Sequence, residues 1–249
     1  MVMRFQQVMV SVLASVAALW LPPASAGSFG ISPLRLELSG QVRTGVLTVR
    51  NDEDAPALIQ VETLLWTQDD GQEKLDPTTD LLVSPTVFTL PPKGTQLVRV
   101  ALRSSPDPSR ELSYRVILQE VPPEASPDFT GLRLALRLSI PAFVAPTAAA
   151  KQDLTWSATY DTTGAIVVRA DNNGGAHARV LSLTLTPESG TGPVLQDTVA
   201  TYVLPGQFRT WTLQNNNKTR DDSTASAARY RLKANTGQGE VVAELTPAR

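Results

Sequence analysis

Three arginines lie inside apolar segments of the sequence, where their guanidinium groups have a chemical use. Arg35, Arg99 and Arg115 each have an apolar residue on both sides. A planar guanidinium binds both oxygens of a carboxylate, so several arginines in one region are suited to holding such a group. The alternative is that each lies on the solvent face of an ordinary strand, which is the commoner situation for arginine.

Groups that support catalysis or metal binding are scarce. The chain has no cysteine and one histidine, His177, which follows a glycine turn. This composition disfavours a zinc site, a thiol nucleophile and a Ser-His-Asp site. Acids are paired at Asp69-Asp70 and Asp221-Asp222, in turn-like contexts that do not fix two carboxylates at a set separation. The sequence therefore predicts a protein that is not an enzyme and uses neither a metal nor another cofactor.

One segment alternates leucines strictly. Leu132, Leu134, Leu136, Leu138 and Ile140 share one parity, and arginine, alanine or serine occupies the other. Successive side chains of a strand point to opposite faces, so this segment predicts a strand with an apolar ridge on one side. The ridge either fills the core of its own domain, which is the commoner case, or is lent to another protein. The pattern alone leaves both readings open.

The elements that must position these residues are strands. Apolar runs of strand length alternate with turn clusters along the whole chain, without a credible amphipathic helix, and this predicts β-sandwiches. The first sandwich is expected to use strands over 34–38, 45–49, 57–66, 81–90, 95–102, 111–121 and the leucine segment 132–140. A linker is expected over 141–150, and a second sandwich with strands at 154–156, 165–170, 177–186, 198–203, 210–213, 230–234 and 240–245.

The first residues predict export rather than structure. Arg4, an apolar stretch and Ala24-Ser25-Ala26 form the pattern of a secretory signal cleaved after Ala26, the alternative being an uncleaved anchor. No later segment is apolar enough for a bilayer span, so no membrane insertion is expected after cleavage. The rest of the 249 residues suits two domains, 27–145 and 146–249. The formal charge of −2 disfavours a nucleic-acid partner.

The order of these features resembles that of periplasmic pilus-assembly chaperones, the PapD-like group. The resemblance is strongest from Ile31 to Pro146 and is carried by residues 32–38, 49–51, 90–94, Arg99, Glu111, 119–123 and the leucine segment. It is similar to the divergent branch of the family that serves archaic or spore-coat-type pili. It implies an all-β fold of two immunoglobulin-like domains in a boomerang arrangement, a periplasmic location, and pilin-like subunits and an outer-membrane usher as partners.

The resemblance also implies roles for individual residues. The leucine segment would be the donor strand that completes the sheet of an unfinished pilin subunit. Arg35 stands where the family has an arginine that anchors the C-terminal carboxylate of the subunit. The second anchor of the family, a lysine near the end of the donor strand, falls on Pro141, which has no charge. Arg115 is the first candidate for the missing charge and Arg137 the second, whereas pairing of Arg115 with Glu111 is the structural alternative.

Arg99 and Glu111 match residues that the family uses in an interdomain ion-pair network. We therefore expect a periplasmic chaperone that stabilises pilin-like subunits by donor-strand complementation and delivers them to an outer-membrane usher. The alternatives are a secreted structural or adhesive protein, which includes a pilus component, and a carbohydrate-active enzyme, for which no convergent acid pair is evident. An exposed leucine ridge is an aggregation hazard, so self-association that caps the ridge is also considered.

Overall fold

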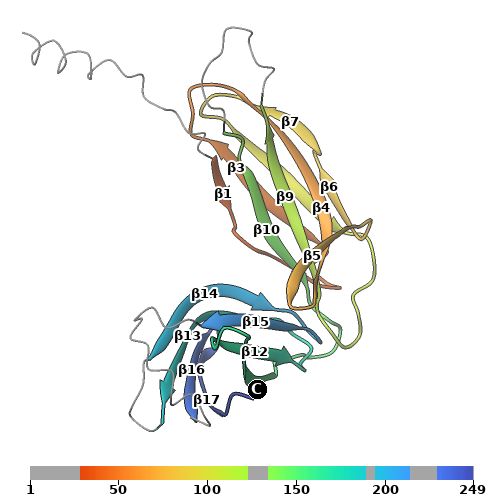
Figure 1. The fold of residues 1–249 in the computed structure, drawn as a ribbon. Helices are drawn as coiled ribbons and strands as arrows, with labels where there is room; N and C mark the ends of the chain where they lie inside the picture. The colour runs from red at the N-terminus through yellow and green to blue at the C-terminus, as the bar shows by residue number, and fades with distance from the viewer. Residues whose placement is uncertain (1–28, 123–133, 189–193, 214–228, 249) are drawn as a thin grey trace, which may run out of the picture.

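The structure is a computed structural model that describes residues 29–122, 134–188, 194–213 and 229–248. These residues form two β-sandwiches whose long directions meet at an angle (Figure 1). The expected signal segment, Leu132 and Asp221-Asp222 lie outside the described residues. Within the described ranges, no helix has the length and apolar character to cross a membrane.

The first domain packs a smaller sheet against a larger one. The smaller sheet has the order β1-β3-β8-β6, made of β1 (Phe29–Ser32), β3 (Thr44–Asn51), β8 (Thr95–Leu102) and β6 (Leu81–Ser84). The larger has the order β2-β10-β9-β4-β5, with β7 also on β4; the strands are β2 (Leu36–Leu38), β10 (Arg137–Val144), β9 (Leu112–Val121), β4 (Ala57–Asp69), β5 (Gln72–Pro77) and β7 (Val87–Leu90). Apolar side chains such as Leu47, Val98 and Tyr114 fill the space between the sheets.

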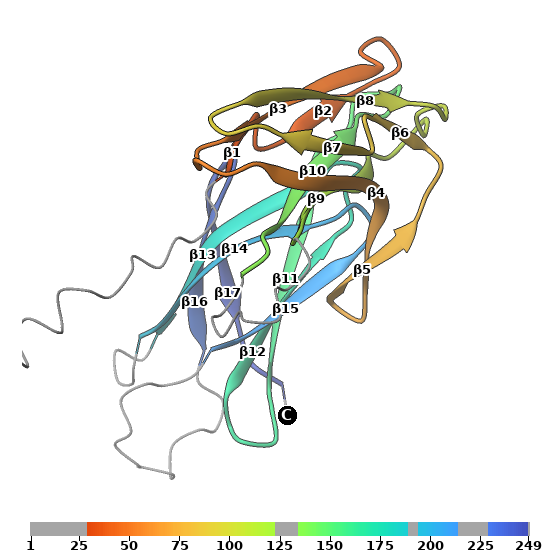
Figure 2. The same ribbon diagram turned by 90° about the horizontal axis from the view of Figure 1, so that it is seen from above.

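The second domain is built in the same way, and Figure 2 shows it from above. Its three-stranded sheet has the order β11-β12-β15, made of β11 (Leu154–Tyr160), β12 (Ile166–Asn172) and β15 (Phe208–Leu213). Its four-stranded sheet has the order β14-β13-β16-β17, made of β14 (Leu195–Val203), β13 (Ala178–Pro187), β16 (Tyr230–Thr236) and β17 (Gly239–Leu245). The core between them includes Val168, Leu183, Trp211 and Leu232. The expected domain border at residue 145 stays a prediction.

The start of the chain departs from the prediction. A strand was expected over 34–38, but β2 begins at Leu36, and Leu34 and Arg35 lie in a bend. The cause is that the chain passes here from the smaller sheet, where β1 lies, to the larger one. Pro33, which has no N–H for a ladder, marks the passage. Arg35 is therefore not a strand residue, and the direction of its side chain is not set by the alternation of a strand.

One further predicted strand is wrong in extent, and one strand was not predicted. The expected strand 81–90 is divided at Pro85 into β6 and β7, which belong to different sheets. Strand β5 was not predicted, because its side chains are polar and largely exposed at the edge of the sheet. Because β5 was not predicted, its residue Glu73 was not recognised as a partner of Arg115.

The leucine segment forms its strand later than expected. β10 spans Arg137–Val144 rather than 132–140, so the expected linker begins inside the strand. The carbonyl of Leu136 accepts the N–H of Glu120 at 2.8 Å, so residues of this parity direct their backbone groups toward β9. The nitrogen of Pro141 has the opposite parity and points away from β9. A proline is tolerated there because no bond of the β9–β10 ladder is lost.

Candidate functional site

The first half of β10 has a free edge. β10 pairs with β9 over its whole length but with β2 only at Ala142–Val144. From Arg137 to Pro141 its other edge has no strand partner among the described residues. By the alternation of an antiparallel ladder, the N–H groups of Arg137 and Ser139 point to this edge. An unpaired edge of this kind is a template for a strand of another chain.

The leucine ridge becomes more exposed toward the start of the segment. Ile140 is buried in the core of the first domain, and Leu138 packs against that core. Leu136 is half-buried, and Leu134 is 61% exposed. The two readings of the ridge therefore apply to different parts of it, because one end fills its own core and the other end is available to a partner.

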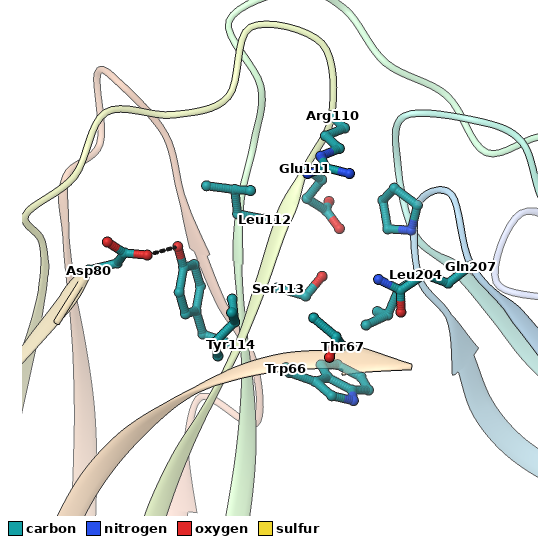
Figure 3. A pocket seen from close by; sticks show the side chains of 12 residues that line it. Trp66, Thr67, Asp80, Arg110, Glu111, Leu112, Ser113, Tyr114, Leu204 and Gln207 are labelled. Atoms are coloured by element: carbon teal, nitrogen blue, oxygen red, sulfur yellow. Dashed lines mark hydrogen bonds between the residues drawn. The ribbon is translucent and has the colours of Figure 1, made fainter. Parts of the chain in front are cut away.

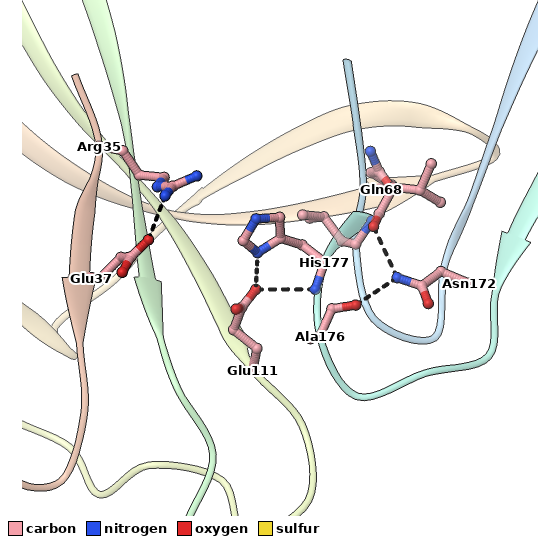
Figure 4. Close-up of polar contacts among 9 residues, drawn as sticks. Arg35, Glu37, Gln68, Glu111, Asn172, Ala176 and His177 are labelled. Carbon is pink, nitrogen blue, oxygen red and sulfur yellow. Dashed lines mark hydrogen bonds and ion pairs between the residues drawn. The ribbon is translucent and has the colours of Figure 1, made fainter. Parts of the chain in front are cut away.

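Arg35 lies where the free edge ends. Leu36 pairs with Ala142 in a parallel register, so Arg35 precedes β2 as Pro141 precedes Ala142. The side chain of Arg35 is 45% exposed, and its guanidinium forms an ion pair with Glu37 at 2.6 Å (Figure 4). A strand laid along the free edge would end beside this guanidinium.

Arg115 already has partners. It lies on β9 opposite Pro141, on the outer face of the larger sheet. Its guanidinium is 3.6 Å from the centre of the Trp66 ring and 3.0 Å from Glu73, and the side chain is only 12% exposed. Burial lowers the pKa of Arg115, and Glu73 opposes that shift. The alternative pairing of Arg115 with Glu111 is not made, because Glu111 is paired with His177, and the role of Arg115 as a carboxylate anchor stays a prediction.

A groove between the two domains brings Arg35 near a second arginine. Its volume is about 600 Å³, and we call it the arginine groove; it is lined by Pro33, Leu34, Arg35, Glu37, Arg179 and Tyr202. The guanidinium of Arg179 lies 5.8 Å from the centre of the Tyr202 ring. Arg179 is the second residue of β13 in the second domain and is exposed. Arg179 was not predicted from the sequence, because nothing in the local pattern links a residue of the second sandwich to the start of the first.

Glu111 and Arg99, expected in one interdomain network, are not brought together. Glu111 contacts the second domain, where it lies 2.7 Å from Nδ1 of His177 (Figure 4). Arg99 lies on β8 of the smaller sheet, exposed and without an ion pair to any described residue. The interdomain role of Glu111 thus has a partner in the structure, whereas that of Arg99 has none among the residues described.

Aromatic rings fill the interface between the domains. Phe143 stacks on His177 with a centroid distance of 3.8 Å, and Tyr202 meets the edge of Trp66 at 5.5 Å. We call these four residues the interdomain aromatic cluster. His177 was expected to be an ordinary strand-end or surface histidine, but its side chain is only 17% exposed and is part of this cluster.

Polar contacts fix the same interface. The side-chain amide of Gln68 donates to the carbonyl of Tyr202 at 2.7 Å and accepts the N–H of Leu204 at 3.0 Å. The N–H of Glu111 donates to the carbonyl of Gly175 at 2.8 Å. A Cβ at Gly175 would lie 2.5 Å from the carbonyl oxygen of Ser109, so only glycine permits this approach. These contacts from both domains determine the angle at which they meet.

A second cavity, of about 270 Å³, lies within this interface (Figure 3). Two acids line it, but Asp80 accepts a hydrogen bond from Tyr114 at 3.0 Å and Glu111 is paired with His177. Each carboxylate therefore has a structural partner. Elsewhere in the described ranges, no three His, Cys, Asp or Glu side chains are grouped to bind a metal ion.

Comparison with known proteins identifies the family of this chain. The family described as "Pili and flagellar-assembly chaperone, PapD N-terminal domain" matches residues 28–150. The chain belongs to the PapD-like family of pilus-assembly chaperones. This confirms the resemblance seen in the sequence, and the predicted all-β fold of two immunoglobulin-like domains is confirmed as well. The family is a non-enzymatic one.

Solved structures share the fold at low sequence identity. A chain of the CsuC–CsuE chaperone–tip adhesion subunit pre-assembly complex, from archaic chaperone-usher Csu pili of Acinetobacter baumannii, has a TM-score of 0.64 and 19% identity over 89% of this chain and 100% of that chain. The Pseudomonas aeruginosa CupB2 chaperone has a TM-score of 0.54 and 20% identity over 88% and 100%. A chain of the Salmonella enterica SafA pilin–SafB chaperone complex has a TM-score of 0.58 and 18% identity over 91% and 98%. No curated protein sequence matches this chain.

Proposed function

We propose that this protein is a periplasmic chaperone that binds pilin-like subunits by donor-strand complementation and delivers them to an outer-membrane usher. The observation that carries the proposal is the free edge of β10 beside a leucine ridge whose outer end is exposed. A subunit that lacks one strand has an open edge and a groove into its core. The edge of β10 supplies backbone partners, and alternate leucines supply side chains for the groove.

The parallel pairing of β2 with β10 supports one direction for the bound strand. β2 is parallel to β10 and begins at the point where the free edge ends. A subunit strand that continues the line of β2 and runs parallel to β10 therefore ends beside Arg35. Its C-terminal carboxylate would then lie next to the guanidinium of Arg35, which would anchor it. An antiparallel strand would place its amino end there, next to a positive charge.

The exposed leucines provide the energy of capture. Full burial of a leucine contributes about 1.5–3 kcal/mol, before the cost of ordering the partner. Leu134 has the most surface left to bury among the described leucines of the ridge, and Leu136 is only half-buried. In the free protein, self-association through this ridge is a further proposal, which sedimentation at increasing concentration tests.

Capture of a subunit tests the proposal. We expect a pilin-like subunit co-expressed in the periplasm to co-purify with wild type and to be lost with Leu134→Asp, while the melting temperature of the free chaperone is unchanged. Leu82→Asp is the matched control, because Leu82 is also exposed (51%) but lies on the other sheet. Retention of the subunit by Leu134→Asp, or equal loss with Leu82→Asp, contradicts the proposal. Self-assembly of wild type into fibres would instead favour a pilus component.

A further inference from the structure

We propose that Arg179, from the second domain, is the second cation that binds a carboxylate together with Arg35 in the arginine groove. The inference rests on the proposed function, since the ligand class is the C-terminal carboxylate of a bound subunit. From the sequence, the second charge was expected within the first domain, at Arg115 or Arg137.

Desolvation of the ligand explains the need for two cations. A carboxylate enclosed between two domains loses water, and this loss is compensated only by good hydrogen bonds and opposite charge. One guanidinium of the groove is already shared, because Arg35 is paired with Glu37 at 2.6 Å. A bound carboxylate must therefore displace Glu37 or find additional charge.

Arg179 has the properties required of that additional charge. It lines the arginine groove with Arg35, and it forms no ion pair with any described residue. Its guanidinium lies above the ring of Tyr202, which also contacts Trp66 and Phe143 of the first domain. Tyr202 thereby holds the base of the groove against the first domain and keeps Arg179 on the side of Arg35.

The other candidates are less available. Arg115 is covered by Trp66, paired with Glu73 and only 12% exposed. Arg137 is paired with Glu62 at 3.6 Å and lies at the far end of the free edge from β2. Neither lines the arginine groove.

A consequence is that the carboxylate bridges the two domains. Arg35 belongs to the first domain and Arg179 to the second, so their separation depends on the interdomain angle. The contacts of Glu111, Gln68 and the interdomain aromatic cluster fix that angle. Binding of the carboxylate is thus expected to stiffen the angle further, because a bridging ligand favours one separation of the two cations.

The test compares two peptides. The probe is a short peptide of alternating valine and threonine, labelled at its amino end, with either a free carboxylate or an amide at its carboxyl end. We expect wild type to prefer the carboxylate form, and Arg179→Met to lose at least about tenfold in affinity for it, as for loss of one charged hydrogen-bond partner. Methionine keeps an apolar chain over Tyr202. Arg179→Lys should restore part of the preference, because it restores the charge without the planar fork.

The controls separate this inference from the proposed function. Arg231→Met, at an exposed arginine of β16 in the same domain, should leave the preference unchanged. Equal binding of both peptides to wild type, no binding of either, or an unchanged preference in Arg179→Met overturns the inference. If Arg179→Met also captures a co-expressed subunit as wild type does, the proposed function stands without this site. If wild type captures no subunit but prefers the carboxylate peptide, the groove stands and the proposed function fails.

Discussion

Arg35 and Arg115, both predicted from the sequence to anchor a carboxylate, should respond differently to removal. The perturbations are Arg35→Ala and Arg115→Ala. Arg35 is exposed and its ion pair with Glu37 is open to solvent, whereas Arg115 is covered by Trp66 and paired with Glu73 at 3.0 Å. The first variant should therefore affect binding and the second should affect stability.

The magnitudes follow from these surroundings. A cation–π contact that is largely desolvated contributes about 1–2 kcal/mol, and a charge-assisted hydrogen bond about 1.5–3 kcal/mol. Because the two contacts of Arg115 share one guanidinium, we expect Arg115→Ala to lower the free energy of unfolding by about 2–4 kcal/mol in total. An exposed ion pair contributes about 0–1 kcal/mol, so Arg35→Ala should lower the free energy of unfolding by no more than about 1 kcal/mol. For a carboxylate ligand, Arg35→Ala should instead cost about 2–5 kcal/mol of affinity.

Urea unfolding followed by circular dichroism and fluorescence measures the free energy of unfolding of both variants. Titration with a carboxylate peptide measures their affinity for the ligand. Arg50→Ala is the matched control, because Arg50 is 61% exposed and also paired with an acid, Asp52, at 2.8 Å. A structural role for Arg115 is contradicted if Arg115→Ala is as stable as Arg50→Ala and loses affinity for the carboxylate. That result would return Arg115 to the role of anchor expected from the sequence.

Three further predictions concern single contacts. Glu37→Gln frees the guanidinium of Arg35 and should increase the affinity for a carboxylate peptide by up to about fivefold, the factor for the roughly 1 kcal/mol that an exposed ion pair contributes at most, in the titration described above; no change would exclude competition by Glu37. Glu111→Ala removes the partner of His177 and should lower stability by about 1–3 kcal/mol and separate the unfolding of the two domains in calorimetry; a single unchanged transition would contradict its interdomain role. Burial raises the pKa of Tyr114, so its neutral form is favoured in the folded state, and stability is lost as the pH rises above the pKa of the unfolded state, about 10. Tyr114→Phe should therefore lose less stability than wild type between about pH 10 and 12. Equal slopes of stability against pH in the two proteins would contradict this.

The fold class was predictable because it depends on local patterns. Alternating apolar residues and turn clusters located most strands, and β8 spans the predicted residues 95–102. The borders failed where the chain changes sheets, as at Pro33 and Pro85, since the pairing partner of a strand is not encoded in its own pattern. Strand β5 was missed because a polar edge strand has no apolar periodicity.

The site was predictable only in part, because its residues come from distant parts of the chain. Arg35 was found from its apolar neighbours and from the resemblance, although it lies in a bend and not in a strand. The partners of Arg115 are on β4 and β5, and no sequence pattern links them to β9. His177 contacts Phe143 and Glu111, and Arg179 lines a groove with Arg35, only when the two domains meet. A groove between domains is a property of that meeting and not of either sequence segment.

Hydrogen exchange at single residues of β10 would show whether the free edge of this strand binds the subunit. In the free protein, the amides of Arg137 and Ser139 face the open edge and should exchange rapidly, whereas those of Leu138 and Ile140 are directed toward β9 and should be protected. On capture of a pilin-like subunit, we expect the amides of Arg137 and Ser139 to become protected and those of Leu138 and Ile140 to stay protected. Rapid exchange at Arg137 and Ser139 in a stable complex would show that the subunit binds elsewhere and would contradict donor-strand complementation by this protein.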